Sequence, residues 1–217
     1  MSARYTLFIG SKNTSSWSLR PWLAMKMANL PFEEVLIALR RPETKEEIKP
    51  HSPSGKVPAL RIEEGARVQT VWDSLAICET LAERHPGAHL WPADASTRAE
   101  ARSVTAEMHS GFPDLRNALS MDIARRHPVP ALDEAVQGQI ARIVAIWEAA
   151  LMRYKNEAGF LFGEFSIADA FYAPVVTRFQ TYGIPLPAVA QAYTQRIVAL
   201  APMREWEIAA KAQVAKE

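Results

Sequence analysis

The sequence contains very little cysteine, since Cys78 is the single one among 217 residues. One thiol excludes an internal disulfide and is typical of a protein from a reducing compartment. Its place in a helical pattern indicates a buried packing residue rather than a reactive thiol. The five histidines show no metal-ligand spacing, so we expect no metal site.

Charge bias and long hydrophobic runs are also missing. The formal net charge is +1, and no basic face or acidic tail indicates a nucleic-acid partner. No apolar run approaches the roughly 18 residues that cross a bilayer, so we expect no membrane partner. The chain enters a strand-like segment containing Arg4 without an apolar leader, and we therefore expect a cytoplasmic protein.

Residues 5–27 are the most informative stretch. A strand-like run, a glycine and a hydroxyl-rich loop lead into a helical pattern. Pro21 predicts that the helix begins near Trp17 or Ser18, because proline is tolerated in the first turn of a helix. Ser15 and Ser16 would then lie beside free N–H groups and the positive end of the helix dipole. This turn suits an anion; the alternative is that one serine only caps the helix.

Residues 1–87 alternate between strand and helix patterns. The expected strands are 5–9, 32–39, 56–62 and 67–72, and the expected helices begin near 17, 40 and 73. Thr44 and Glu47 form a capping-box pattern in the short second helix. The first two strands flank a helix and should be parallel, whereas the last two should form a hairpin. This order predicts an α/β domain of thioredoxin-like layout.

Beyond a composition break at 88–97, the pattern is entirely helical. The expected helices cover 98–124, 133–156, 166–182, 187–200 and 203–210. The first of these should bend at Gly111 and Pro113. Ser166 and Asp169 form an S-x-x-D capping box, which indicates a structural role at a helix start. We therefore expect an all-α domain over 98–217, joined to the first domain by a linker over 88–97.

Four features in order resemble the glutathione transferase superfamily, over nearly the whole chain. The stretch SSWSLR at 15–20 is similar to the S-S-C-S-x-R stretch of the zeta class. The others are the proline-entered strand at 57–58, the Asp-Ser pair at 73–74 and the capping box at 166–169. The resemblance implies a serine-type bacterial member of that superfamily, with its two-domain architecture.

The resemblance also implies a site for glutathione, a tripeptide with two carboxylates, an amine and a thiol. Family members hold the Val-Pro bond in cis, which would direct the Val57 backbone at the peptide. Ser74 would receive the γ-glutamyl carboxylate at a helix start. Lys56 would approach the glycyl carboxylate, with a solvated lysine as the alternative. The implied glutathione-binding residues are Trp17, Lys56, Val57, Pro58, Asp73 and Ser74.

Thiol chemistry needs the thiolate, which a serine hydroxyl stabilises by donating a hydrogen bond to sulfur. Ser15 aligns with the zeta-class catalytic position, but a longer preceding loop leaves Ser16 as an alternative. Trp17 replaces a cysteine of that class, which argues against disulfide exchange at this loop. A tyrosine-type site is disfavoured, because Tyr5 lies early in a strand where it should be packed.

The second substrate would lie against the long helix of the all-α domain. Met108, Phe112, Arg116 and Met121 fall at helical spacing on a mostly apolar stripe that should face the first domain. Plain core is the alternative for the apolar members, and Arg116 would need a partner or an anionic ligand.

The function implied is that of a glutathione transferase, in which a serine-stabilised thiolate adds to a small electrophile. One alternative is a glutathione-dependent cis-trans isomerase of the zeta type, whose anionic substrate Arg20 and Arg116 would suit. Another is a non-catalytic regulatory or binding protein with the same fold. The resemblance and the surface-like Trp72 also predict a symmetric homodimer.

Overall fold

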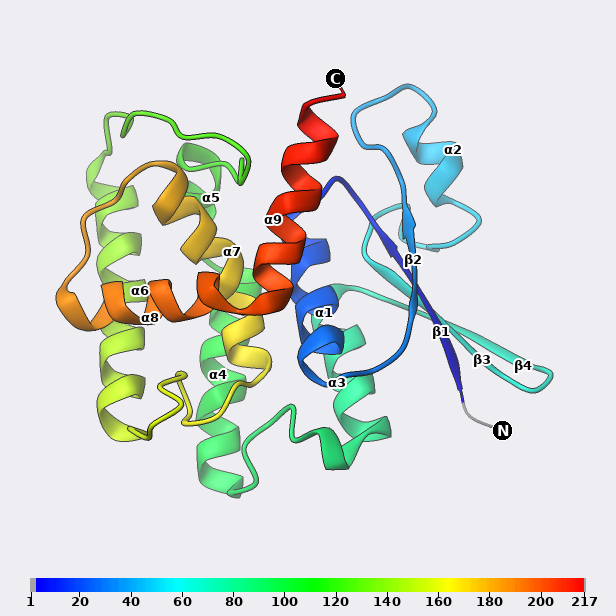
Figure 1. Cartoon of the computed structure of the whole chain (residues 1–217), viewed down its shortest axis with the longest axis horizontal. Helices are drawn as coiled ribbons and strands as arrows, with labels where there is room; N and C mark the ends of the chain where they lie inside the picture. Colours follow the sequence, from blue (N-terminus) through cyan, green and yellow to red (C-terminus); the bar gives the residue numbers. More distant parts are fainter. Residues whose placement is uncertain (1–2, 217) are drawn as a thin grey trace.

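The computed structural model describes residues 3–216, which form an α/β domain followed by a helical domain (Figure 1). The α/β domain is built on a sheet with the strand order β2-β1-β3-β4. β1 is parallel to β2, and β3 is antiparallel to both of its neighbours. The strands are β1 (Arg4–Ile9), β2 (Glu33–Leu36), β3 (Ala59–Glu64) and β4 (Arg67–Trp72), and the helices are α1 (Ser16–Met27), α2 (Thr44–Ile48) and α3 (Ser74–Arg84). The thioredoxin-like layout is confirmed.

α7 is the central helix of the helical domain, and every one of its residues except Gln180 is buried. The elements of this domain are η1 (Pro86–Ala88), α4 (Ala95–Ser110), α5 (Pro113–Ala118), α6 (Glu134–Arg153), α7 (Ile167–Thr181), α8 (Ala188–Ala199) and α9 (Ala201–Val214). α7 packs against α1, which joins the two domains. α9, red in Figure 1, lies between the sheet and the other helices, next to α1.

Several local expectations are confirmed. Tyr5 is packed and 3% exposed, and Cys78 is fully buried on α3. The Val57–Pro58 peptide bond is cis. The capping box at the start of α7 is formed, with the Ser166 N–H donating to Asp169 Oδ2 at 2.9 Å.

The expected helix over 98–124 is wrong, because the chain breaks instead of bending. α4 begins earlier, at Ala95, and ends at Ser110. Phe112 has a φ of 60°, which no helix continues, and Pro113 begins the short α5. The apolar stripe predicted on one helix is therefore divided among two helices, the turn between them and the loop that follows.

The capping box predicted for α2 is also wrong. Glu43 occupies the N-cap position. Thr44 Oγ1 instead donates to the Ala38 carbonyl at 2.8 Å, and Glu47 pairs with Arg41. These side chains fasten the loop before the helix, so they are not available to cap it.

α1 begins at Ser16, so Pro21 lies in its second turn rather than its first. Proline has no N–H, so the usual helical hydrogen bond to the carbonyl four residues earlier, that of Trp17, cannot form. The strand expected over 32–39 is shorter, at Glu33–Leu36, and the last helix is longer than expected.

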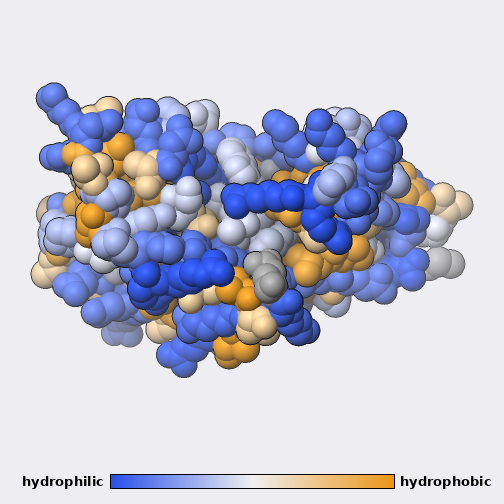
Figure 2. All heavy atoms as spheres, turned by 90° about the horizontal axis from the view of Figure 1, so that it is seen from above, coloured by the Kyte–Doolittle hydropathy of each residue, from blue (hydrophilic) through white to orange (hydrophobic). Residues whose placement is uncertain are grey.

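Figure 2 shows one face of the molecule, on which hydrophobic residues form separate patches among hydrophilic ones. Across residues 3–216, no helix is both long enough and apolar enough to traverse a bilayer. The same part of the chain holds no group of three or more His, Cys, Asp and Glu side chains arranged to bind a metal ion.

Candidate functional site

A cavity of about 430 Å³ lies where the start of α1, the entry to β3 and the start of α3 meet. All six residues that the sequence analysis assigned to glutathione line it, together with Ser54 and Trp72. A cavity of about 500 Å³ at the turn between α7 and α8 is larger, but its lining carries no charged side chain. The cavity at α1 therefore has both the shape and the polar groups for a charged ligand.

The start of α3 presents polar groups at one corner of this cavity. Asp73 has a φ of 74°, and its Oδ1 accepts from the N–H groups of Leu75 and Ala76 at 2.8 and 3.3 Å. Ser74 is fully buried, and its Oγ accepts from Arg20 Nη1 at 3.3 Å. Because Ser74 accepts that bond, its hydroxyl hydrogen remains free to donate to an anion.

Ser15 and Ser16, the two candidate catalytic serines, have different partners. Ser15 is at the N-cap position of α1, and its Oγ lies 2.7 Å from Ser18 Oγ. Ser18 Oγ in turn accepts from the Gly10 N–H at 3.0 Å. Ser16 Oγ accepts from Arg178 Nη2 of α7 at 3.2 Å. The expectation that one serine caps the helix is wrong, because no side-chain cap forms at this end of α1.

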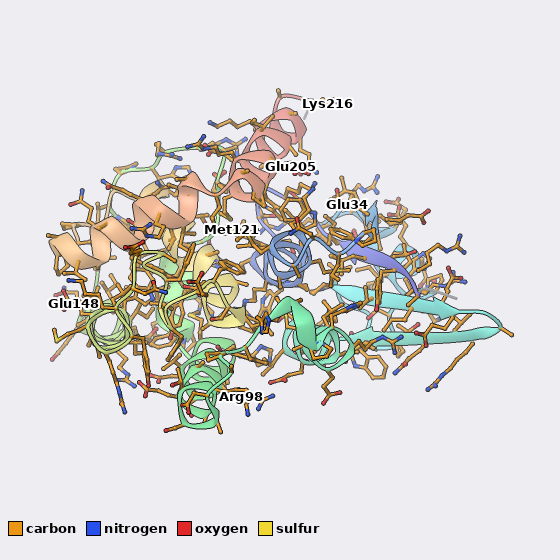
Figure 3. All side chains as sticks on the ribbon, turned by 60° about the horizontal axis from the view of Figure 1, so that its bottom comes forward. Glu34, Arg98, Met121, Glu148, Glu205 and Lys216 are labelled. Atoms are coloured by element: carbon orange, nitrogen blue, oxygen red, sulfur yellow. The ribbon has the colours of Figure 1, made fainter. Side chains whose placement is uncertain are left out.

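The loop that carries the serines is held by Lys12. Its Nζ lies 2.7 Å from Glu34 Oε1 and 5.2 Å from the ring centroids of both Trp22 and Trp206. Glu34 Oε2 also accepts from Trp22 Nε1 at 2.7 Å. Figure 3 labels Glu34 on β2 and Glu205 on α9; the latter pairs with Lys26 of α1. Lys12 is thus a buried cation with a carboxylate and two indole faces as partners.

The C-terminal helix also holds the backbone of this loop. Trp206 Nε1 donates to the Lys12 carbonyl at 2.7 Å, and the Lys12 N–H donates to Gln213 Oε1 at 2.9 Å. The next residue, Asn13, is bonded to the segment after α5. Its Nδ2 donates to Asp122 Oδ1 at 2.9 Å, and its Oδ1 accepts from the Ala124 N–H at 2.9 Å. Sequence reasoning missed these contacts, because residues more than a hundred positions apart carry no local pattern.

Three guanidinium groups gather where the domains meet beside the serine loop: Arg20, Arg116 and Arg178. Arg116 donates to the carbonyls of Met108 and Gly111, and its guanidinium carbon lies 5.1 Å from the Trp17 ring centroid. Arg178 donates to the carbonyls of Leu119 and Arg116 as well as to Ser16. None of the three makes an ion pair within residues 3–216.

Burial together with the positive charge of neighbouring arginines lowers the pKa of two members of this cluster, Arg20 and Arg178. Burial lowers the pKa of Arg20 to about 9, with further lowering from the charges of Arg116 and Arg178. Burial and the charge of Arg116 likewise lower the pKa of Arg178 to about 10. Both groups stay charged near neutral pH, so the interface concentrates positive charge that an anion would neutralise.

The residues assigned to the second substrate are not brought together as expected. Met108, Phe112 and Met121 are packed into the core, at 2%, 6% and 3% exposure. The break after α4 explains this, because it turns the chain inward at Phe112. Arg116 alone remains beside the cavity wall, next to Trp17.

His109 of α4 is a site residue that the sequence analysis missed. Its Nδ1 lies 3.5 Å from Arg20 Nη1 and its Nε2 3.4 Å from Asp73 Oδ2. Arginine can only donate, so Nδ1 accepts and the ring hydrogen is on Nε2, facing the carboxylate. Burial is the largest cause that lowers the pKa of His109; the charge of Asp73 opposes it, and the charges of Arg20 and Arg116 lower the pKa further. A neutral histidine therefore connects the helical domain to the start of α3.

Family models match both domains. The model of the glutathione S-transferase N-terminal domain covers residues 14–84, and that of the C-terminal domain covers 122–207. The chain belongs to the glutathione S-transferase family. The second match begins after α5, so the arginine-bearing segment of α5 lies outside both models.

Relatives within the family include isomerases. The chain is 29% identical over 185 residues to the probable maleylacetoacetate isomerase of Caenorhabditis elegans, covering 82% of this chain and 81% of that protein. It is 29% identical over 187 residues to the maleylacetoacetate isomerase of Pseudomonas aeruginosa, covering 84% of each. The structure of maleylacetoacetate isomerase from Anaeromyxobacter dehalogenans, with glutathione in its active site, matches with a TM-score of 0.69 at 26% identity, covering 94% of this chain and 95% of that one.

Proposed function

We propose that the cavity at the start of α1 binds glutathione. Ser74 would donate to the γ-glutamyl carboxylate, since its oxygen already accepts from Arg20. The backbone of Val57 would pair with the central residue of the peptide, and Lys56 at the cavity wall would approach the glycyl carboxylate. The glutathione in the active site of the Anaeromyxobacter isomerase structure supports this assignment.

The sulfur of the bound peptide would lie at the serine turn, where it loses its proton. A hydroxyl donating to sulfur, beside the N-terminus of α1, stabilises the thiolate. Ser15 is the proposed donor: if Ser18 donates to Ser15, the Ser15 hydrogen remains free for sulfur. Ser16 is the alternative, with its oxygen held by Arg178.

The second substrate would be a small unsaturated acid. The observation that carries this proposal is the cluster of three arginines without a carboxylate partner beside Ser16. The glutathione sulfur would add to a cis double bond conjugated to a carbonyl, leaving an enolate with a single bond that can rotate. The enolate would then expel the thiolate and restore a trans double bond, so glutathione is regenerated. The isomerase names of the relatives support this outcome.

Conjugation is the second candidate activity. The half-exposed indoles of Trp17 and Trp72 at the cavity favour a small apolar electrophile, to which the same thiolate would add without leaving again. We expect the isomerisation of a cis-unsaturated keto acid to be faster than conjugation with chlorodinitrobenzene. Faster conjugation would instead assign the chain to the transferases.

Glutathione binding is tested by titration calorimetry on Ser74→Ala. Loss of a hydrogen bond to a charged group costs about 1.5–3 kcal/mol, so the affinity should fall roughly ten- to a hundredfold. Ser54→Ala is the matched control, because Ser54 also lines the cavity but its hydroxyl already pairs with Ser52 at 3.0 Å. Equal affinity of wild type and Ser74→Ala would contradict the assignment.

The symmetric homodimer stays a prediction. Trp72, whose surface-like character suggested it, is 44% exposed at the end of β4. Sedimentation at micromolar concentration should give twice the 24.2 kDa of one chain, and the monomer mass would overturn it.

A further inference from the structure

One edge of the Arg20 guanidinium group makes no hydrogen bonds. It is fully buried, yet its Nε and Nη2 have no hydrogen-bond partner. Only Nη1 is engaged, with Ser74 and His109. An unpaired buried donor costs free energy, and an unpaired buried charge costs more.

That edge has the geometry of a carboxylate-binding edge in this same chain. Arg102 uses Nε and Nη2 together on the two oxygens of Glu79, at 2.9 and 3.0 Å. Arg142 uses the same two atoms on Glu107, at 2.7 and 2.9 Å. Two parallel hydrogen bonds from one guanidinium match a carboxylate in both geometry and charge. Arg20 keeps this edge free and buried, where such bonds are strongest.

Trp17 separates the Arg20 guanidinium from the cavity. Its ring centroid lies 4.2 Å from the guanidinium carbon of Arg20, and the indole lines the cavity at 37% exposure. Of the other groups around the guanidinium, Phe171, at 4.7 Å, and Ser74 are fully buried, whereas His109 is partly exposed but does not line the cavity. Trp17 is the exposed group that both lines the cavity and contacts Arg20, so an anion in the cavity reaches the guanidinium most directly by displacing the Trp17 indole.

Trp17 is less firmly held than three of the other tryptophans, although Trp147 likewise has no acceptor for its indole N–H. Trp22, Trp91 and Trp206 each donate their indole N–H to an oxygen of the protein. The Trp17 indole N–H has no such acceptor within residues 3–216. Pro21 in addition cannot donate to the Trp17 carbonyl, which weakens the backbone hold on this turn.

We propose that Arg20 is a carboxylate-binding residue covered by Trp17, and that a ligand carboxylate takes its Nε and Nη2 together once the indole moves aside. The proposal rests on the proposed function for the choice of ligand. The carboxylate would come either from glutathione, whose γ-glutamyl end adjoins Ser74, or from the second substrate at the arginine cluster. In both cases Trp17 makes access to Arg20 depend on ligand binding.

The test is the Nε–H resonance of Arg20 in ¹⁵N-labelled protein, assigned by its loss in Arg20→Met. The probes are glutathione, succinate and neutral succinamide, each titrated separately. A downfield proton shift with glutathione alone supports the peptide as the source. A shift with succinate alone supports the second substrate, and shifts with both show that each can occupy the edge. No shift with either carboxylate, or an equal shift with succinamide, would overturn the proposal.

The succinate affinities of three variants test separately whether Trp17 covers Arg20 and whether Arg20 binds the carboxylate. Succinate affinity, measured by calorimetry, should rise about fivefold in Trp17→Ala, because no indole has to move, and should change little in Trp17→Phe. Arg20→Met should lose at least tenfold, while its melting curve shows that it folds. Weaker succinate binding in Trp17→Ala would contradict the proposal that the Trp17 indole covers Arg20. Turnover is measured independently, so an enzyme that isomerises its substrate without an Arg20 response refutes this inference alone.

Discussion

Lys12 and Arg20 are buried cations eight residues apart, on either side of the serine turn, and their surroundings differ sharply. Lys12 has the Glu34 carboxylate at 2.7 Å and two indole faces at 5.2 Å. Arg20 also has two aromatic faces, those of Trp17 and Phe171, but its charge has no carboxylate. Its nearest cationic neighbours, Arg116 and Arg178, make its burial more costly.

The difference separates a structural cation from a functional one. A buried charge whose partners are complete fixes the geometry of the segments it joins, here the serine loop, β2 and α9. A buried charge left incomplete lowers stability, and such a cost is typical of groups that act on a ligand. The two residues therefore predict opposite responses to the same substitution.

Lys12→Met should have the largest effect on stability. It removes a buried cation that two indole faces and the partly exposed Glu34 carboxylate stabilise, so the free energy of unfolding should fall by about 2 kcal/mol. Urea denaturation measures it. Lys26→Met is the matched control, because Lys26 also lies 5.2 Å from the Trp22 ring and pairs with a glutamate at 2.8 Å, but both partners are more exposed. The control should lose less than about 1 kcal/mol. Equal losses would break the comparison.

The serines extend the comparison to catalysis, because Ser15 is bonded within the first domain and Ser16 to the arginine cluster. Ser15→Ala should raise the pKa of bound glutathione toward about 8.5 and lower turnover roughly ten- to a hundredfold. Ser16→Ala should instead lower the melting temperature, since Arg178 loses an acceptor. Thiolate absorbance titrated against pH in each variant, saturated with glutathione, is the measurement. If only Ser16→Ala shifts the curve, Ser16 is the donor.

Arg20→Met should raise stability in the absence of ligand. It removes an uncompensated buried charge while keeping an apolar side chain between Trp17 and Phe171, so the free energy of unfolding should rise by about 1 kcal/mol. The same urea experiment as for Lys12→Met gives a direct contrast of sign. A loss as large as that of Lys12→Met would make Arg20 a structural residue.

His109→Gln should have the smallest effect, visible only in the pH dependence. The pKa of His109 is lowered in the folded state, so the unfolded chain binds the extra proton first. Its contribution is fully present above about pH 6.5 and is lost as the pH falls toward the folded-state value. Glutamine can accept from Arg20 and donate to Asp73 without titrating, so the variant should lose less stability than wild type between about pH 7 and 5. Parallel losses in the two proteins would show that His109 does not titrate.

Much of the fold could be predicted from sequence, because its signals are local. The bounds of β4 and the capping box at Ser166 follow from neighbouring residues. The break after α4 was missed: Gly111 and Pro113 marked the place, but the left-handed Phe112 between them depends on how the domain packs. The short helix α2 was predicted, but its capping box was wrong for the same reason, since Thr44 Oγ1 donates to the more distant Ala38 carbonyl.

The cavity lining was predicted through the family resemblance, whereas its surroundings were not. Residues 57–58 and 73–74 form short motifs that can be read from neighbouring residues in the sequence. The partners of Arg20, and the presence of Arg178 and His109 at the site, depend on how two domains meet. The spacing of residues along the chain does not predict how the two domains pack, and it does not predict the contacts of Lys12 with α9 either.

The contacts from α9 to the serine loop also set the order in which the site is completed during synthesis. The loop is synthesised well before Trp206 and Gln213, which hold Lys12 and follow it about two hundred residues later in the chain. A nascent chain can form the sheet and the cavity wall long before the serine turn has its final support. Residues 206–213, far from the cavity in sequence, therefore complete the site only late in synthesis, and a chain cut short before Trp206 would carry every residue proposed to bind glutathione beside an unsupported loop.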